Sequence, residues 1–98
     1  MTINQRRDGS TLVLTLVGRM DTSTSPEAEA VIIRETKDVK ELILDLMYLD
    51  YVSSAGLRVI LKAQKIMNSQ GRMKLIHVKK DVLEILDITG FINILTIE

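Results

Sequence analysis

The sequence lacks cysteine entirely and contains few aromatic residues. With no cysteine among its 98 residues, the chain cannot form a disulfide framework, a thiol nucleophile or a thiolate metal site. Aromatic residues make up 3% of the chain, against 46% hydrophobic residues in all, so the core must be built from Ile, Leu, Val, Ala and Met. These absences favour an ordinary intracellular domain over a small secreted scaffold.

An excess of one charge and a long apolar run are also absent. Lysine plus arginine and aspartate plus glutamate each number 13, so no net field attracts nucleic acid or an anionic membrane. No apolar run approaches the ~20 residues that a membrane-spanning helix needs, and the opening "MTINQRRDGS" lacks the apolar stretch of a signal peptide. We therefore expect a cytoplasmic protein with no nucleic-acid or membrane partner.

The chain is long enough for one domain with a modest core and too short for two, so we expect a single domain over residues 1–98. Its first segment predicts two strands joined at Asp8 and Gly9, a pair that tolerates the positive dihedral angles of a tight hairpin. The second of these strands has alternating leucines, at Leu12, Leu14 and Leu16.

A change of period after this hairpin predicts the first helix. Ser25 is a natural N-cap, Pro26 fits the first helical position and Glu27 complements the helix dipole. The good helix formers that follow extend this helix to about Thr36.

The rest of the chain alternates between short apolar runs and helical patterns. Strands are predicted at "ELILDL" (41–46), "MKLIHV" (73–78) and "FINILTI" (91–97), and helices at 56–68 and 79–90. The first of these runs is typical of a central strand covered on its faces, and its central residues are expected to be buried: Leu42, Ile43 and Leu44. The order of elements predicts a layered α/β domain with a mixed sheet.

The helix at 56–68 is apolar over most of its circumference. Steps of 100° place Arg58, Lys62, Lys65 and Ser69 on one narrow strip, and apolar residues occupy most of the rest. The helix is therefore mostly buried, with only this basic strip facing water. Such a strip is commonly a solvated face, but its position beside the preceding serines favours contact with an acidic partner surface.

Ser53 and Ser54 lie directly before this helix, and two explanations are open. The Ser54 hydroxyl can cap the helix by accepting a free backbone N–H, an interaction worth ~1 kcal/mol. Alternatively, the same helix start tolerates an anion, and a phosphate there adds about −1.5 to −2 charges to an otherwise neutral surface. Ala55 and Gly56 leave the approach to these hydroxyls open.

The motif "LDYVSSAGLRVIL", preceded by "ELILDL" and by "GRMD" at 18–21, resembles the STAS domain. This module occurs in bacterial anti-sigma factor antagonists and in the tails of sulphate transporters. The resemblance spans nearly the whole chain and implies a single STAS-like α/β domain, a small mixed β-sheet flanked by helices. It further implies an antagonist that binds an anti-sigma factor with serine kinase activity. Phosphorylation by that kinase releases the antagonist, and a serine phosphatase of the metal-dependent type resets it.

Aligned through Gly56 and Leu57, the family's Asp-Ser-Ser/Thr-Gly-Leu pattern makes Ser54 the phosphoacceptor. Ser53 takes the place of the preceding Asp, and Ala55 that of the second hydroxyl. Asp21 matches the acidic residue that lies near the acceptor in this family; a turn or cap before the first helix explains it equally well. The partner surface expected around Ser54 comprises Asp21, Tyr51, Ser53, Ala55, Gly56, Arg58 and Lys62.

Catalytic, metal and cofactor sites are not expected. The single histidine, His77, lies in a predicted strand, where a packing or edge role is favoured. Asp21, Asp45 and Asp50 would have to converge to hold a cation, and the scattered glycines form no phosphate-binding loop. The chain is thus predicted to be a substrate of enzymes and not an enzyme. A constitutive STAS scaffold, in a sensory or transport assembly without phosphorylation, is the alternative; an enzyme would need a deep pocket of converging polar groups.

Overall fold

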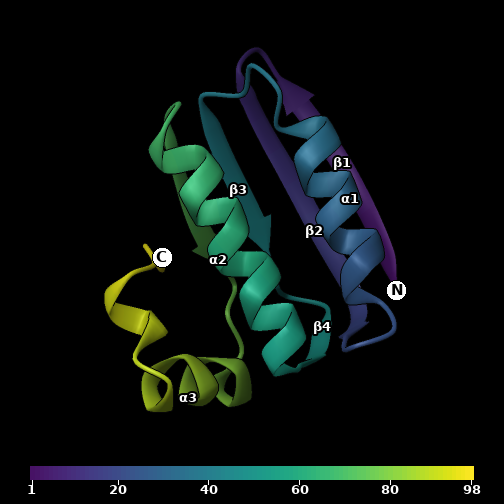
Figure 1. Cartoon of the computed structure of the whole chain (residues 1–98), viewed down its shortest axis with the longest axis vertical. Helices are drawn as coiled ribbons and strands as arrows, with labels where there is room; N and C mark the ends of the chain where they lie inside the picture. Colours follow the sequence, from purple (N-terminus) through teal and green to yellow (C-terminus); the bar gives the residue numbers. More distant parts are fainter.

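A computed structural model describes all 98 residues, as a mixed sheet with helices packed against it (Figure 1). The strands are β1 (Thr2–Asp8), β2 (Thr11–Met20), β3 (Glu41–Asp45), β4 (Leu49–Val52) and β5 (Arg72–Ile76). The helices are α1 (Ser25–Glu35), α2 (Ser54–Asn68), α3 (Lys80–Ile88) and the short 3-10 helix η1 (Phe91–Asn93). This arrangement confirms the predicted single α/β domain with a mixed sheet. None of the helices is both long enough and apolar enough to span a bilayer.

The long strand β2 organises the sheet, whose main order is β1-β2-β3-β5. β1 pairs with it in antiparallel register, and β3 and then β4 pair with it in parallel, one after the other along its length. β5 runs parallel to β3. All strands except β1 therefore point toward the same edge of the sheet, and β2 and β4 end there together. β4 is an addition to the elements predicted from the sequence.

Burial alternates along the central strands, because the helices cover only one face of the sheet (Figure 1). Leu12, Leu14 and Leu16 are completely buried, and so are Leu42 and Leu44. The expectation that Ile43 is buried with them was wrong: it lies on the opposite face and is half-buried. The helices α1 and α2 lie side by side over the buried face, and their apolar sides complete a single core.

Several predicted boundaries shift by one or two residues. The hairpin turn is formed by Gly9 and Ser10, since Asp8 still pairs with Thr11. The N-cap of α1 is Thr24 and not Ser25, because the Ser25 N–H already bonds to the Asp21 carbonyl at 2.8 Å. Pro26 accordingly occupies the second helical position.

The predicted last strand was wrong. Gly90 adopts a left-handed conformation with φ 81° and ends α3 as expected, but the chain then forms η1. Only Ile97 contacts the sheet as a strand residue, through an isolated parallel bridge to Leu75. A short apolar run such as "FINILTI" is ambiguous in its period. Here Leu95 is buried in the core although the segment does not form a strand.

Candidate functional site

The two serines lie at the edge of the sheet where β2 and β4 end side by side. Met20 and Val52 are paired in parallel register, and the Ser53 N–H donates to the Met20 carbonyl at 2.8 Å. The next residues along the two strands are Asp21 and Ser53. The sheet therefore brings the acidic turn after β2 next to the start of α2, although the two are more than thirty positions apart.

The two hydroxyls have different environments. Ser53 is the N-cap of α2: its Oγ accepts the Gly56 N–H at 3.2 Å, and its carbonyl accepts the Leu57 N–H at 2.8 Å. Ser54 is the first helical residue, is exposed, and its hydroxyl makes no hydrogen bond within the protein. The capping explanation is therefore correct for the neighbouring serine and wrong for Ser54, which is exposed and whose oxygen does not cap the helix.

Gly56 is buried where α2 crosses the end of β2. A Cβ at this position would lie 2.8 Å from Val52 Cγ2 and 2.9 Å from both the Met20 carbonyl oxygen and Met20 Cγ. Only glycine permits this approach, which fixes the start of α2 against the sheet. Ala55, one residue earlier, is half-buried and adds little bulk beside Ser54.

Asp21 organises the turn between β2 and α1. Its Oδ1 accepts the Ser23 hydroxyl at 2.8 Å, the Ser23 N–H at 3.0 Å and the Thr24 N–H at 3.1 Å. These bonds hold the pKa of Asp21 below its ordinary value, with the largest effect from the Ser23 hydroxyl and the next from the Thr24 N–H. The turn role that the sequence left open is confirmed, and the carboxylate remains 30% exposed.

Tyr51 lies on β4 and is 40% exposed. The guanidinium carbon of Arg19 stands 4.4 Å from the centre of its ring, a cation–π contact between paired strands. Tyr48 and Met47, in the turn before β4, are 55% and 41% exposed. Sequence reasoning missed Arg19 and Tyr48; the contact of Arg19 with Tyr51 follows from the pairing of β4 with β2, which the local sequence does not show.

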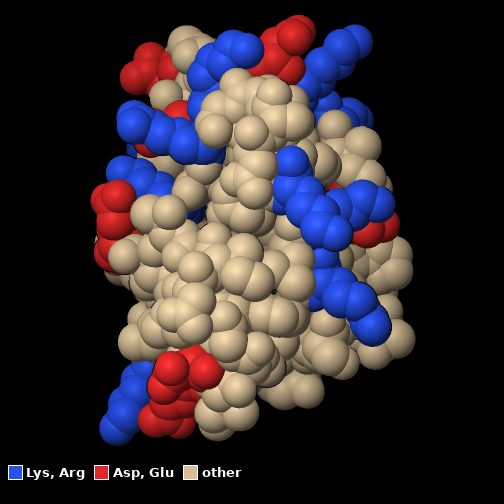
Figure 2. Space-filling model, turned by 60° about the vertical axis from the view of Figure 1, so that its left-hand side comes forward, with Lys and Arg blue, Asp and Glu red and all other residues tan.

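The basic strip of α2 begins at Arg58, one turn after Ser54, and continues along the helix. Arg58, Lys62 and Lys65 are all exposed, as predicted, and Figure 2 shows Lys and Arg side chains following one another down the right of that view. Lys62 pairs with Glu29 of α1 at 3.5 Å, whereas Arg58 makes no ion pair or hydrogen bond. A free guanidinium thus lies one helical turn from the free hydroxyl.

The family model of the STAS domain matches residues 2–98. The chain belongs to the STAS domain family. BtrV of Bordetella bronchiseptica, which bears the name of an anti-sigma factor antagonist, is 36% identical over 85 residues, covering 85% of this chain and 73% of BtrV. These findings confirm the family that the sequence motifs indicate.

Solved STAS structures share the fold at low identity. An anti-sigma factor antagonist from Mycobacterium paratuberculosis aligns with a TM-score of 0.89 at 18% identity, over 98% of this chain and 83% of that one. SpoIIAA of Bacillus, in its phosphorylated form, aligns with a TM-score of 0.69 at 16% identity, over 99% and 91%.

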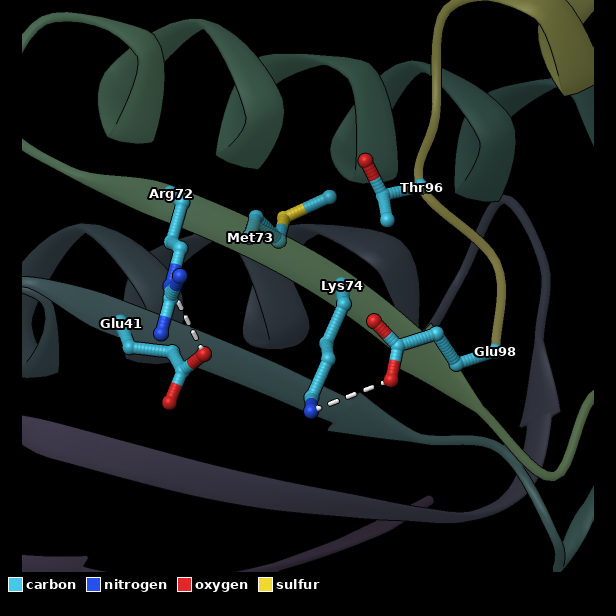
Figure 3. Close-up of a pocket in the computed structure, with 6 residues that line it drawn as sticks. All are labelled: Glu41, Arg72, Met73, Lys74, Thr96 and Glu98. Carbon is cyan, nitrogen blue, oxygen red and sulfur yellow. Dashed lines mark hydrogen bonds and ion pairs between the residues drawn. The ribbon is translucent and has the colours of Figure 1, made fainter.

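A hollow of this STAS domain is bordered by residues of β3, β5 and the C-terminal segment and by neither serine (Figure 3). Its volume is about 230 Å³, and it is bordered by Glu41, Arg72, Met73, Lys74, Thr96 and Glu98. Arg72 pairs with Glu41 at 2.9 Å and Lys74 with Glu98 at 3.3 Å. The four charged residues at this hollow therefore form two ion pairs. We interpret them as structural contacts at the edge of the sheet and not as a binding site.

The remaining titratable candidates do not converge. The prediction that His77 lies in a strand was wrong, because β5 ends at Ile76. His77 has φ 55°, and its Nδ1 lies 2.9 Å from Asp45 Oδ1 at the end of β3. Asp50 pairs with Lys79 at 3.2 Å. No three acidic or histidine side chains of the STAS domain gather as a metal site requires, so Asp21, Asp45 and Asp50 stay apart. His77 and Asp45 join the ends of two parallel strands.

Proposed function

We propose that this STAS domain is an anti-sigma factor antagonist switched by phosphorylation of Ser54. In this proposal it is a binding module and not an enzyme. Its unphosphorylated form binds an anti-sigma factor that is itself a serine kinase. The observation that supports it most is the exposed hydroxyl of Ser54, which has no hydrogen-bond partner while its neighbour caps α2. The name of BtrV supports the antagonist role.

The proposed cycle has two chemical steps. In the first, the Ser54 oxygen attacks the γ-phosphorus of ATP bound to the kinase; the hydroxyl proton passes to the kinase, and ADP leaves. In the second, a serine phosphatase of the metal-dependent type hydrolyses the ester with water, which regenerates the hydroxyl and releases phosphate. The STAS domain supplies only the oxygen and its access.

The docking surface proposed for the anti-sigma factor surrounds Ser54. It comprises Asp21, Tyr51, Ser53, Ala55, Arg58 and Lys62. Gly56, which the sequence placed on this surface, is buried and shapes the surface only by holding α2 against the sheet. Tyr51, stacked on Arg19, offers a rigid aromatic surface at one side, and Arg58 and Lys62 offer positive charge at the other. A phosphate on Ser54 adds bulk and about two negative charges in the middle of this surface, which breaks the fit without refolding the domain.

Phosphorylation is tested by mass spectrometry after incubation with the cognate kinase and ATP. The expected product gains one phosphate, located on Ser54 by peptide fragmentation. A phosphate on Ser53 would overturn the alignment of the motif. An unmodified protein would reject the switch in favour of a constitutive scaffold.

Binding of the anti-sigma factor is tested with substitutions at the switch. Ser54→Ala is expected to bind like the unmodified protein, because the hydroxyl makes no contact within the domain. Ser54→Asp is expected to weaken binding by roughly tenfold or more through charge at the interface. Isothermal titration gives both affinities. Ser10→Asp, in the exposed β1–β2 turn, adds the same charge far from Ser54 and is the control; equal losses in both Asp variants would contradict the proposed surface.

A further inference from the structure

Arg58 lies one turn after Ser54 on the same face of α2. Residues four apart in a helix have neighbouring side chains, with about 5–6 Å between their Cβ atoms. Both side chains are exposed on this helix. A group attached to the Ser54 oxygen therefore comes within reach of the Arg58 guanidinium, whichever way the rest of the surface is arranged.

Arg58 is also the member of the basic strip nearest to Ser54, and it has no partner. Lys62, one turn further, is held by Glu29 at 3.5 Å. Lys65 has no ion pair, but it lies about three turns from Ser54. A phosphate on Ser54 would thus meet one free guanidinium, and Arg is the side chain whose planar donors best match a phosphate.

The surroundings of Arg58 offer room for a group from a partner. Arg58 borders two hollows of the surface, of about 250 and 350 Å³. The smaller is also bordered by Ser25, which is 3% exposed and whose buried Oγ has no hydrogen-bond partner. Glu29 borders it too, already paired with Lys62. A carboxylate from a docking protein finds an exposed, unpaired guanidinium at the edge of this hollow, whereas the Ser25 hydroxyl is buried beneath it.

We propose that Arg58 binds whichever anion is present: a carboxylate of the anti-sigma factor when Ser54 is unmodified, and the Ser54 phosphate when it is modified. The phosphate then acts as an internal competitor that removes Arg58 from the partner surface. This proposal rests on the phosphorylation of Ser54 proposed above. It assigns the effect of the modification to one neighbouring residue.

The first test measures the second pKa of the phosphate by phosphorus NMR. Phosphoserine is placed at residue 54 during translation, so the sample does not depend on the kinase. Bound by Arg58, the phosphate is expected to titrate below the value near 6 that is usual for phosphoserine. Arg58→Gln is expected to raise this value by about 0.5 pH unit, the size typical of an exposed charge pair. Asp21 is present in both proteins, so its repulsion cancels.

Lys65→Gln is the matched control for this titration, because it removes the same charge three turns from Ser54. An equal shift in both variants, or none in either, would overturn the contact between Arg58 and the phosphate. If the kinase instead fails to modify Ser54, the proposed function fails while the titration still decides this contact.

The second test measures affinity for the kinase in four forms: Arg58 or Arg58→Gln, each with serine or phosphoserine at residue 54. Arg58→Gln is expected to weaken binding of the unmodified form severalfold, and the phosphate is then expected to cause a smaller further loss than in the original chain. Lys37→Gln, in the exposed turn after α1, is the control. If the phosphate weakens binding by the same factor with Arg58 and with Arg58→Gln, the two changes act independently, and the proposal that they compete for Arg58 is overturned.

Discussion

At the scale of the residue, two adjacent serines have different roles: one caps a helix and the other leaves its hydroxyl exposed. Ser53 turns its oxygen inward to the Gly56 N–H, and Ser54 leaves its oxygen in water. An N-cap lost to alanine costs about 1 kcal/mol, whereas an exposed side chain without contacts changes stability by about 0.5 kcal/mol at most. Urea unfolding of Ser53→Ala and Ser54→Ala is therefore expected to show a loss in the first variant only. A larger loss at residue 54 would reverse the assignment of the cap.

Asp21 gives the site a dependence on pH. Its hydrogen bonds lower its pKa in the folded state, so the ionised carboxylate stabilises the fold above the pKa of the unfolded chain. That contribution is lost as the pH falls through the lowered folded-state pKa. Asp21→Asn is thus expected to be less stable than the original chain at neutral pH and to approach it in acid. Urea unfolding of both proteins across this range checks the convergence; a constant difference would contradict it.

At the scale of the element, Gly56 sets how closely α2 approaches the sheet. Alanine stabilises a helix interior by about 1 kcal/mol over glycine, but a Cβ here meets the Met20 carbonyl oxygen at 2.9 Å, and overpacking typically costs about 1–3 kcal/mol. Gly56→Ala is therefore expected to lower stability by roughly 1 kcal/mol and to lower affinity for the anti-sigma factor, because α2 must shift. Thermal unfolding and titration measure both. A raised Tm would show that helix propensity prevails.

The elements also show how far the sequence can predict this molecule. Long periodic segments were predicted well: the alternation of Leu12, Leu14 and Leu16 gave β2, and the basic strip gave the exposed side of α2. Short segments were not, because four residues such as "LDYV" contain too few positions to show a period. β4 is stabilised by its pairing with the far end of β2, a tertiary contact that no local pattern contains.

The site was predictable only in outline, because its details also depend on tertiary pairing. The motif located both serines, but its spacing alone did not decide which hydroxyl caps α2, since this depends on where the helix begins. The parallel pairing of Met20 with Val52 fixes that start at Ser54, two residues before the predicted one. Likewise, the contact between Arg19 and Tyr51 depends on strand register and not on local sequence.

At the scale of the whole molecule, the switch is expected to act on the surface alone. The core is a single cluster of 22 buried residues, to which the exposed Ser54 does not belong. Placing phosphoserine at residue 54 is therefore expected to leave the fold and its Tm nearly unchanged. Amide NMR shifts should be confined to the first turns of α2 and the adjoining ends of β2 and β4. Ser54→Ala provides the reference spectrum. Shifts that spread through β3 and β5 would show instead that the phosphate rearranges the sheet, and that release of a partner follows from a change of fold and not of surface charge.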